Sequence, residues 1–242
     1  MLLLLAGSGE GRRIADALAK AGVRAVASLA GATRSPIGLS LPTRVGGFGG
    51  RQGFEDYLRA TGITAIIDAT HPFASQISHR TAQVAAQNGI PYLQFLRPEW
   101  HPAPGDNWIM LDREKDAAKI IPVGSNVFLA TGRQTLDQFA NLTGRHLTCR
   151  QIDPPDGPFP FPNGTFRVGR PPFSKEDEIA LFDKLSIDWL VVKNAGGEPS
   201  RSKLDAARAL KIPVAMIRRP PQPAGDKAER IADALSWARS KS

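Results

Sequence analysis

Short, largely apolar segments that alternate with segments of helical spacing are the feature that most constrains the fold of this chain. The first apolar run, Leu2–Ala6, is followed at once by residues 9–21, where apolar side chains recur at helical intervals. Strands that alternate with helices predict βαβ units and a parallel sheet, and wholly apolar strands fit burial on both faces. The predicted strands are residues 2–6, 23–29, 65–68, 92–96, 126–130, 146–151, 189–192 and 214–217, and the predicted helices are 9–21, 51–60, 73–87, 136–142, 174–185, 199–210 and 224–241.

This alternation divides into two series of similar length, because a second set of strands begins near residue 125. We therefore predict an α/β fold of two Rossmann-like parallel-sheet domains with a ligand cleft between them. The first domain is placed at residues 1–115 and the second at residues 116–242. Ser174, followed three residues later by Asp177, predicts a capping box at the start of one helix of the second domain.

The composition is that of a soluble globular protein, with 42% hydrophobic and 22% charged residues. Cys149 is the single cysteine, which excludes an internal disulfide and any site of several cysteine ligands. A reducing compartment suits such a chain, so we expect a cytoplasmic protein. The apolar run at residues 1–6 is too short to span a membrane, so no membrane partner is expected.

The chain is basic, with 31 Lys and Arg against 23 Asp and Glu and a net charge of +8. Such a charge favours an anionic partner. The basic residues are scattered, are not interleaved with aromatic residues and show no zinc-finger spacing, so we expect no nucleic acid. His71 and His79 lie eight positions apart rather than four, so we expect no metal site. A small anionic cofactor with an acidic substrate explains the charge better.

The segment "AGSGEGRR" follows the first strand and opens the first helix. Gly7 and Gly9 match the first two glycines of G-x-G-x-x-G, whereas Arg12 takes the third position. Glycine lets the backbone approach a phosphate closely, and the start of a helix favours an anion. We therefore predict a phosphate-binding loop, with a tight turn that binds no ligand as the alternative. Its expected cofactor contacts are Gly7, Ser8, Gly9, Glu10 and Arg12.

The end of the second strand indicates which dinucleotide would bind. An NAD site usually has an acidic residue about twenty positions after the glycine loop, but the chain has no carboxylate from Val23 to Gly50 and has Ser28 at that place. A hydroxyl with the guanidinium of Arg34 suits a 2′-phosphate, so we predict NADPH/NADP+, although Arg34 as a solvated loop charge is the alternative. "GGFGG" at 46–50 is either a second ligand loop or a mobile one. The further expected cofactor contacts are Ser28, Ala30, Gly31, Arg34, Gly47, Phe48 and Thr70.

The segment "DATHPFA" places polar side chains directly after the buried strand at residues 65–68. Ligands of parallel α/β sheets bind beyond the carboxyl ends of the strands. Histidine as a residue type titrates near neutrality, and Pro72 would stiffen the backbone, so His71 is the leading candidate for proton donor or electrophilic stabiliser. Asp68 and Thr70 are the other catalytic candidates, and they equally suit the ribose or the nicotinamide amide. A helix-entry histidine bonded to backbone, with a proton from solvent, is the alternative.

Two further strand ends carry groups that suit an acidic substrate, in "TGRQT" and "KNAGG". Basic side chains there would contact carboxylates, whereas a surface lysine is the alternative for Lys193. The predicted substrate contacts are His71, Ser75, Arg133, Lys193, Asn194 and Gly196.

Seven segments in this order resemble the precorrin-6A reductases of cobalamin biosynthesis: "GSGEGRR", "SLAGATRSP", "GGFGG", "DATHPFASQIS", "RPEW", "KNAGG" and "SKLDAARALKIPV". "DATHPFA" is the most specific, and "KNAGG" departs from the family pattern with Ala195 in place of the expected serine. The resemblance implies an oxidoreductase acting on a CH–CH group, which uses NADPH to reduce a macrocycle double bond of precorrin-6A and gives precorrin-6B. It also implies an anionic tetrapyrrole substrate, which fits the basic chain, and transient contact with neighbouring pathway enzymes.

The sequence is also compatible with two other functions. An S-adenosylmethionine-dependent methyltransferase of the same pathway would also bind its cofactor at a glycine loop, but it normally has an acidic residue at the second strand end. A non-catalytic NADPH-binding protein is the other candidate, and the polar cluster after Ile67 argues against it.

Overall fold

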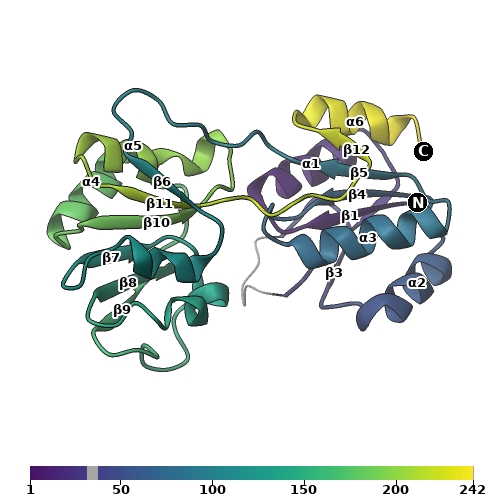
Figure 1. Cartoon of the computed structure of the whole chain (residues 1–242). Helices are drawn as coiled ribbons and strands as arrows, with labels where there is room; N and C mark the ends of the chain where they lie inside the picture. Colours follow the sequence, from purple (N-terminus) through teal and green to yellow (C-terminus); the bar gives the residue numbers. More distant parts are fainter. Residues whose placement is uncertain (32–37, 242) are drawn as a thin grey trace. The chain divides into compact units, whose positions relative to one another are not determined.

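The computed structural model describes residues 1–31 and 38–241, which form two compact units of parallel sheet and helices (Figure 1). The first unit contains Met1–Pro98 and the chain from Pro220 onward, and the second contains Glu99–Arg219. The predicted fold class of two parallel-sheet α/β domains is confirmed. A ligand site shared by both units stays a prediction.

The first unit has a six-stranded sheet in the order β12-β5-β4-β1-β2-β3, with every pairing parallel. This order reverses direction between β1 and β4, as in doubly wound dinucleotide-binding sheets. Even-numbered residues of β1 pack with α1 and α6 on one face, and odd-numbered residues pack with α2 and α3 on the other. The strands are β1 Leu2–Ala6, β2 Ala25–Leu29, β3 Thr43–Val45, β4 Ala65–Ala69, β5 Tyr92–Phe95 and β12 Asp226–Ala228, and the helices are α1 Gly9–Lys20, α2 Gly50–Thr61, α3 Ser75–Gln87 and α6 Ile231–Arg239.

The second unit has its own six-stranded parallel sheet, in the order β6-β11-β10-β7-β8-β9. Five of its strands repeat the order of the first unit, and one apolar cluster joins the sheet to α4 and α5. The strands are β6 Trp108–Leu111, β7 Asn126–Leu129, β8 His146–Gln151, β9 Gly164–Val168, β10 Trp189–Lys193 and β11 Val214–Ile217. The α-helices are α4 Lys175–Lys184 and α5 Ser202–Ala209, and the short 3₁₀ helices are η1 Glu114–Lys119, η2 Arg133–Phe139 and η3 Glu198–Ser200.

The division between the units differs from the predicted boundary at residues 115 and 116. The chain leaves the first unit after Pro98, and β6 pairs with β11 of the second unit. The last residues also return to the first unit, where β12 pairs with β5 and α6 packs on α1. Each sheet thus takes its outermost strand from a segment outside its regular series. We missed this because β12 is a three-residue strand with two exposed charges, Asp226 and Lys227.

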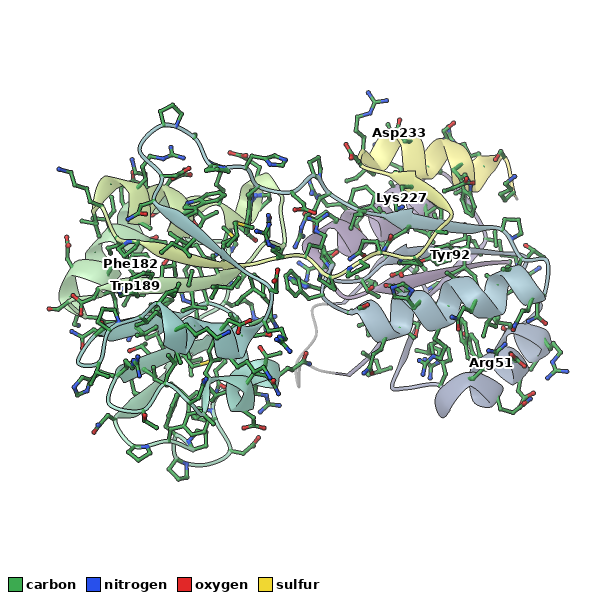
Figure 2. The ribbon with its side chains drawn as sticks, viewed as in Figure 1. Arg51, Tyr92, Phe182, Trp189, Lys227 and Asp233 are labelled. Carbon is green, nitrogen blue, oxygen red and sulfur yellow. The ribbon has the colours of Figure 1, made fainter. Side chains whose placement is uncertain are left out.

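A buried ion pair ties α4 to the sheet of the second unit. Arg150 of β8 donates to both carboxylate oxygens of Glu178, at 2.7 and 2.5 Å, and the Glu178 side chain is only 1% exposed. The guanidinium carbon lies 4.6 Å from the ring centre of Phe128 and 4.3 Å from that of Phe173. Phe182 of α4, labelled in Figure 2, packs against Phe128 at 5.1 Å. The predicted capping box at the start of this helix is also present.

We predict that Glu178→Ala lowers the free energy of unfolding by about 3–5 kcal/mol, because it leaves the buried Arg150 guanidinium without its counter-charge. Urea unfolding followed by tryptophan fluorescence measures this, since three of the four tryptophans lie in the second unit. Glu176→Ala, on an exposed position of the same helix turn, should change the value by less than about 1 kcal/mol. Equal effects of the two variants would contradict a stabilising role for the pair.

Candidate functional site

The loop after β1 is fixed by one serine and one glycine. Ser8 caps α1: its hydroxyl accepts from the Gly11 amide at 3.0 Å and donates to the Ala69 carbonyl of β4 at 2.9 Å. A Cβ at Gly11 would lie 3.3 Å from the Ala69 oxygen and equally close to Ala6. Gly11 therefore permits the close approach of α1 to β1 and β4. This is the packing role of the third glycine in the dinucleotide fingerprint, one position earlier than the pattern that led us to Arg12.

The carboxylate of Glu10 sits in the first turn of α1, where the helix dipole favours a negative charge. Glu10 is buried and bonded to Arg97 at 2.6 Å, and Arg13 lies 3.5 Å from its other oxygen. Arg97, which follows β5, was missed as a site residue because it lies 87 positions away in the sequence. Its charge offsets that of Glu10, so the start of α1 keeps a potential that suits an anion. Arg12 is half-buried, and its Nε has no hydrogen-bond partner among the described residues.

At the end of β2, Ser28 is buried beside the guanidinium of Arg44, which was not among the predicted site residues. Arg44 of β3 stands in register with Ser28 and donates to its hydroxyl at 2.8 Å. Ala30 and Gly31 are exposed just beyond the strand. The predicted contact Arg34 lies outside the described residues. Gly47 and Phe48 belong to the turn that Arg44 holds, since Gly47 accepts from Arg44 at 2.8 Å.

Asp68, at the end of β4, is buried, and both of its carboxylate oxygens accept hydrogen bonds. Its Oδ1 accepts from the Thr70 amide at 3.0 Å and the Thr70 hydroxyl at 2.7 Å, and its Oδ2 accepts from the Tyr92 hydroxyl at 2.9 Å. Burial raises the pKa of Tyr92 well above its usual range, and the Asp68 charge and hydrogen bond raise it further, so this phenol stays a neutral donor. Tyr92 is labelled in Figure 2. Asp68 is 1% exposed, so its hydrogen bonds position Thr70 at the strand end. The expected direct catalytic role of Asp68 stays a prediction.

His71 is half-buried beyond Thr70, at the entry to α3. Its Nδ1 accepts from the Phe73 amide at 3.2 Å, so the neutral ring carries its proton on Nε2. The segment from Pro220 onward stabilises the start of α3, because the Gln222 side chain donates a hydrogen bond to the Pro72 carbonyl at 3.0 Å. Ser75 is the first residue of α3 and is half-buried. Thr70, His71 and Ser75 therefore follow one another along a single braced strand-to-helix connection.

Lys193 occupies the carboxyl end of β10 in the second unit. Its Nζ donates to the Thr135 hydroxyl at 3.0 Å and lies 3.8 Å from a Glu114 oxygen. Burial lowers the pKa of Lys193 below its usual range, and the Glu114 charge offsets part of this shift. Thr131, just after β7, is buried with a hydroxyl that has no partner within the described chain. Arg133 is exposed and pairs with Asp156 at 3.2 Å.

Asn194, an expected substrate contact, is hydrogen-bonded through its side chain to the backbone of Trp100. Its amide oxygen accepts from the Trp100 amide at 2.9 Å, and its amide nitrogen donates to the Trp100 carbonyl at 3.1 Å. The residue is 2% exposed, and its side-chain amide fixes the chain at Trp100. The expected substrate contact stays a prediction. Gly196 follows with a φ of +71°, which favours glycine. Ala195, at the position where the family pattern suggests serine, is buried in the apolar cluster of this unit.

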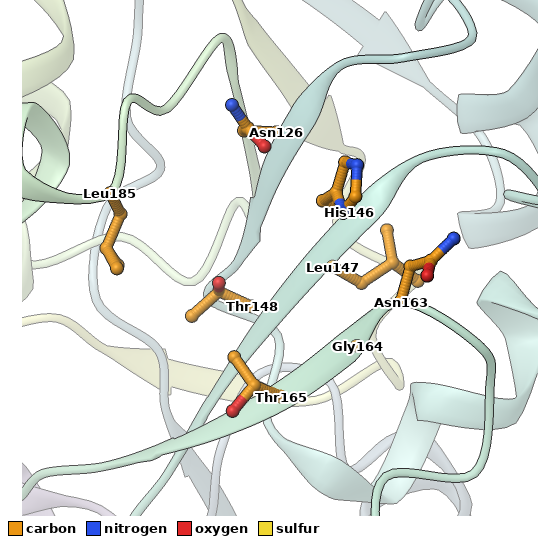
Figure 3. A pocket seen from close by; sticks show the side chains of 8 residues that line it. All are labelled: Asn126, His146, Leu147, Thr148, Asn163, Gly164, Thr165 and Leu185. Atoms are coloured by element: carbon orange, nitrogen blue, oxygen red, sulfur yellow. The ribbon is translucent and has the colours of Figure 1, made fainter.

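A surface pocket of the second unit lies at the other edge of its sheet (Figure 3). Its lining includes Asn126, His146 and Gly164, the first residues of β7, β8 and β9. Ligands of parallel α/β sheets bind at the carboxyl edge, and no predicted site residue lines this pocket.

Within residues 1–31 and 38–241, no group of three or more His, Cys, Asp or Glu side chains is arranged to hold a metal ion. No helix there is long and apolar enough to cross a membrane.

Known proteins resemble this chain over nearly its whole length. Residues 1–239 match the family described as Precorrin-6x reductase CbiJ/CobK. The precorrin-6A reductase of Rhodococcus erythropolis is 47% identical over 98% of this chain and 96% of its own, and that of Rhodobacter capsulatus is 40% identical over 98% and 94%. The solved structure of CobK precorrin-6A reductase has a TM-score of 0.95 at 39% identity and covers 99% of this chain and 96% of its own. The chain therefore belongs to the precorrin-6x reductase CbiJ/CobK family.

Proposed function

We propose that this protein uses NADPH to reduce a double bond of precorrin-6A and thereby forms precorrin-6B. Family membership supports the reductase activity and the tetrapyrrole substrate. The observation that carries the choice of cofactor is the end of β2, where Ser28 and Arg44 meet in a stretch without carboxylates. The methyltransferase and the non-catalytic protein are set aside, because the relatives are named as reductases.

The start of α1 fits a dinucleotide pyrophosphate. A Cβ at Gly9 would meet no described atom within 4 Å, so the backbone there is open to a ligand. The helix start and the neighbouring Arg12 favour an anion, while the Glu10 charge is offset by Arg97. Gly7, Ser8, Gly9 and Arg12 would hold the phosphates, and Glu10 would act through Arg97 instead of touching the cofactor.

NADPH, when bound, supplies the hydride. Reduction of a conjugated double bond also needs the developing negative charge to be stabilised and a proton to reach the second carbon. We assign these tasks to His71, whose Nδ1 accepts from the Phe73 amide, so the Nε2–H of the neutral ring would stabilise the charge as a hydrogen-bond donor. As proton donor, His71 would act from its protonated form and would regain the proton from solvent. Thr70, fixed by Asp68, would orient the bound partners at the same strand end.

Cationic groups of the second unit would bind the acidic side chains of the macrocycle. Lys193 is the last residue of β10, and Arg133 follows the carboxyl end of β7. Each carboxylate that they meet would add a charge-assisted hydrogen bond. Ser75 and the Gly196 backbone are the remaining proposed contacts. A cytoplasmic location and contacts with neighbouring pathway enzymes remain expectations of the same proposal.

We predict that the absorbance of NADPH at saturating protein falls only after precorrin-6A is added. Calorimetric titration first establishes that NADPH binds, and turnover is then followed at the nicotinamide band under anaerobic conditions. NADPH binding without oxidation in the presence of precorrin-6A would contradict the proposed activity. Absence of NADPH binding would contradict the proposed cofactor.

We predict that His71→Ala lowers kcat by roughly 10²–10⁴-fold, the usual contribution of general acid catalysis. The dissociation constant for NADPH should change little, because His71 acts on the macrocycle. His101→Ala, at an exposed histidine of the second unit, serves as the matched control. Near-normal turnover of His71→Ala would show that the proton comes from solvent or from another group.

We predict that two neighbouring glycines separate folding from binding. Gly11→Ala should lower the free energy of unfolding by roughly 1–3 kcal/mol, because its Cβ would crowd Ala6 and Ala69. Gly9→Ala should change stability by no more than about 0.5 kcal/mol, yet weaken NADPH binding about tenfold or more, which is about 1.4 kcal/mol. Thermal unfolding and calorimetry measure the two effects. Unchanged NADPH affinity in Gly9→Ala would argue against a phosphate at this loop.

A further inference from the structure

Arg44 is a prearranged cation at the end of β2 that none of the sequence motifs identified. We propose that Arg44 selects NADPH over NADH by binding the 2′-phosphate of the adenosine ribose. This inference rests on the proposed function and adds the residue that determines cofactor specificity.

The strand register brings Arg44 to the required place. β2 and β3 are parallel with Ser28 paired to Arg44, so both side chains extend from the same face at the carboxyl edge. An acidic residue at the end of the second strand binds the ribose hydroxyls in NAD enzymes, and a nearby arginine accommodates the phosphate in NADP enzymes. Ser28 occupies the acidic position here, and the guanidinium lies 2.8 Å from its hydroxyl.

The guanidinium is held in one orientation by neutral groups only. Nη1 donates to the Ser28 hydroxyl and to the Gly46 carbonyl at 2.9 Å, and Nη2 donates to the Gly47 carbonyl at 2.8 Å. Because a guanidinium has five N–H donors, the Nε hydrogen and one Nη2 hydrogen are without a partner among the described residues. No carboxylate pairs with Arg44 in the part of the chain that the structure describes. Arg44 therefore offers both charge and donors to an anion, and a phosphate accepts such a pair of bonds.

The aromatic side chains beneath Arg44 fix it further. Its guanidinium carbon lies 4.0 Å from the ring centre of Phe48, in the range of a cation–π contact. The ring centre of Phe48 lies 4.7 Å from that of Phe54 and 5.2 Å from that of Tyr57, both of α2. A Cβ at Gly53 would lie 1.9 Å from the Phe48 carbonyl oxygen, so the helix needs a glycine there. The "GGFGG" turn thus supports Arg44 through the Gly46 and Gly47 carbonyls and the Phe48 ring.

The test compares cofactors that differ only in the 2′-phosphate. Dissociation constants for NADPH and NADH are measured by calorimetry for the natural protein and for Arg44→Gln, which removes the charge at similar size. We expect the NADPH constant to rise about 10–100-fold, as for one lost charge-assisted pair, and the NADH constant to change less than about threefold. Arg44→Lys keeps the charge but lacks the planar guanidinium. Its NADPH dissociation constant should therefore lie between those of the natural protein and of Arg44→Gln.

Arg51→Gln is the matched control, because Arg51 is an exposed arginine of α2 (labelled in Figure 2) paired with Glu55. A second readout compares 2′,5′-ADP with 5′-AMP: Arg44→Gln should lose affinity only for the first. Equal weakening of NADPH and NADH would show that Arg44 merely supports the turn, and an unchanged NADPH constant would also overturn the proposal. If Arg44→Gln does not fold, the ratio of the NADPH and NADH dissociation constants of Arg44→Lys decides between the same outcomes. A natural protein that binds neither dinucleotide would refute the proposed function and not this assignment alone.

Discussion

The parallel pairing of β1 with both β2 and β4 is the constraint on which the rest of the first unit depends. Leu5 pairs with Ser28 on one side and with Asp68 on the other. The carboxyl ends of β1, β2 and β4 therefore lie at the same edge of the sheet, with β2 on one side of β1 and β4 on the other. The glycine loop, the 2′-phosphate candidate and the "DATHPFA" connection are brought together by this register, although 60 residues separate the first from the last.

Two arginines of the first unit, Arg97 and Arg44, have partners of different kinds. Glu10 is buried with Arg97 at 2.6 Å, and such a pair keeps the start of α1 from carrying an uncompensated acid that would repel phosphate. Arg44, by contrast, is held by a hydroxyl and two carbonyls, which orient it without neutralising it. A protein gains from orienting a cation in this way when the counter-charge arrives with a ligand, because little reorganisation then remains to be done at binding. Arg97 is bound to a carboxylate and therefore supports the fold, whereas Arg44 has no carboxylate partner among the described residues, as the proposed binding of an anion requires.

The sequence was sufficient to predict the elements with strong periodic patterns. It was insufficient to predict the elements that depend on partners far away in the sequence. β1, β4 and β10 are apolar runs, and their places follow from burial alone. β6 and β12 are short edge strands whose partners lie about a hundred residues away or more, so no local pattern marks them. Asn194 was predicted as a substrate contact because it follows a strand, and no local pattern predicted the hydrogen bonds of its side-chain amide with the Trp100 backbone. Arg44 was overlooked because a three-residue strand between loops has no detectable periodicity.

The two units share a strand order but not the same chemistry at the carboxyl edge, and this difference supports assigning the dinucleotide to the first. After β1 the chain enters a twelve-residue α-helix capped by Ser8, whose free amides and dipole attract an anion. After β7, the equivalent strand, it enters the short 3₁₀ helix η2, with no side-chain cap hydrogen bond. Aligned peptide dipoles are fewer there, so anion binding would depend on side chains. Lys193 and Arg133 stand at that edge, and long cationic side chains suit separate carboxylates on a macrocycle better than a compact pyrophosphate.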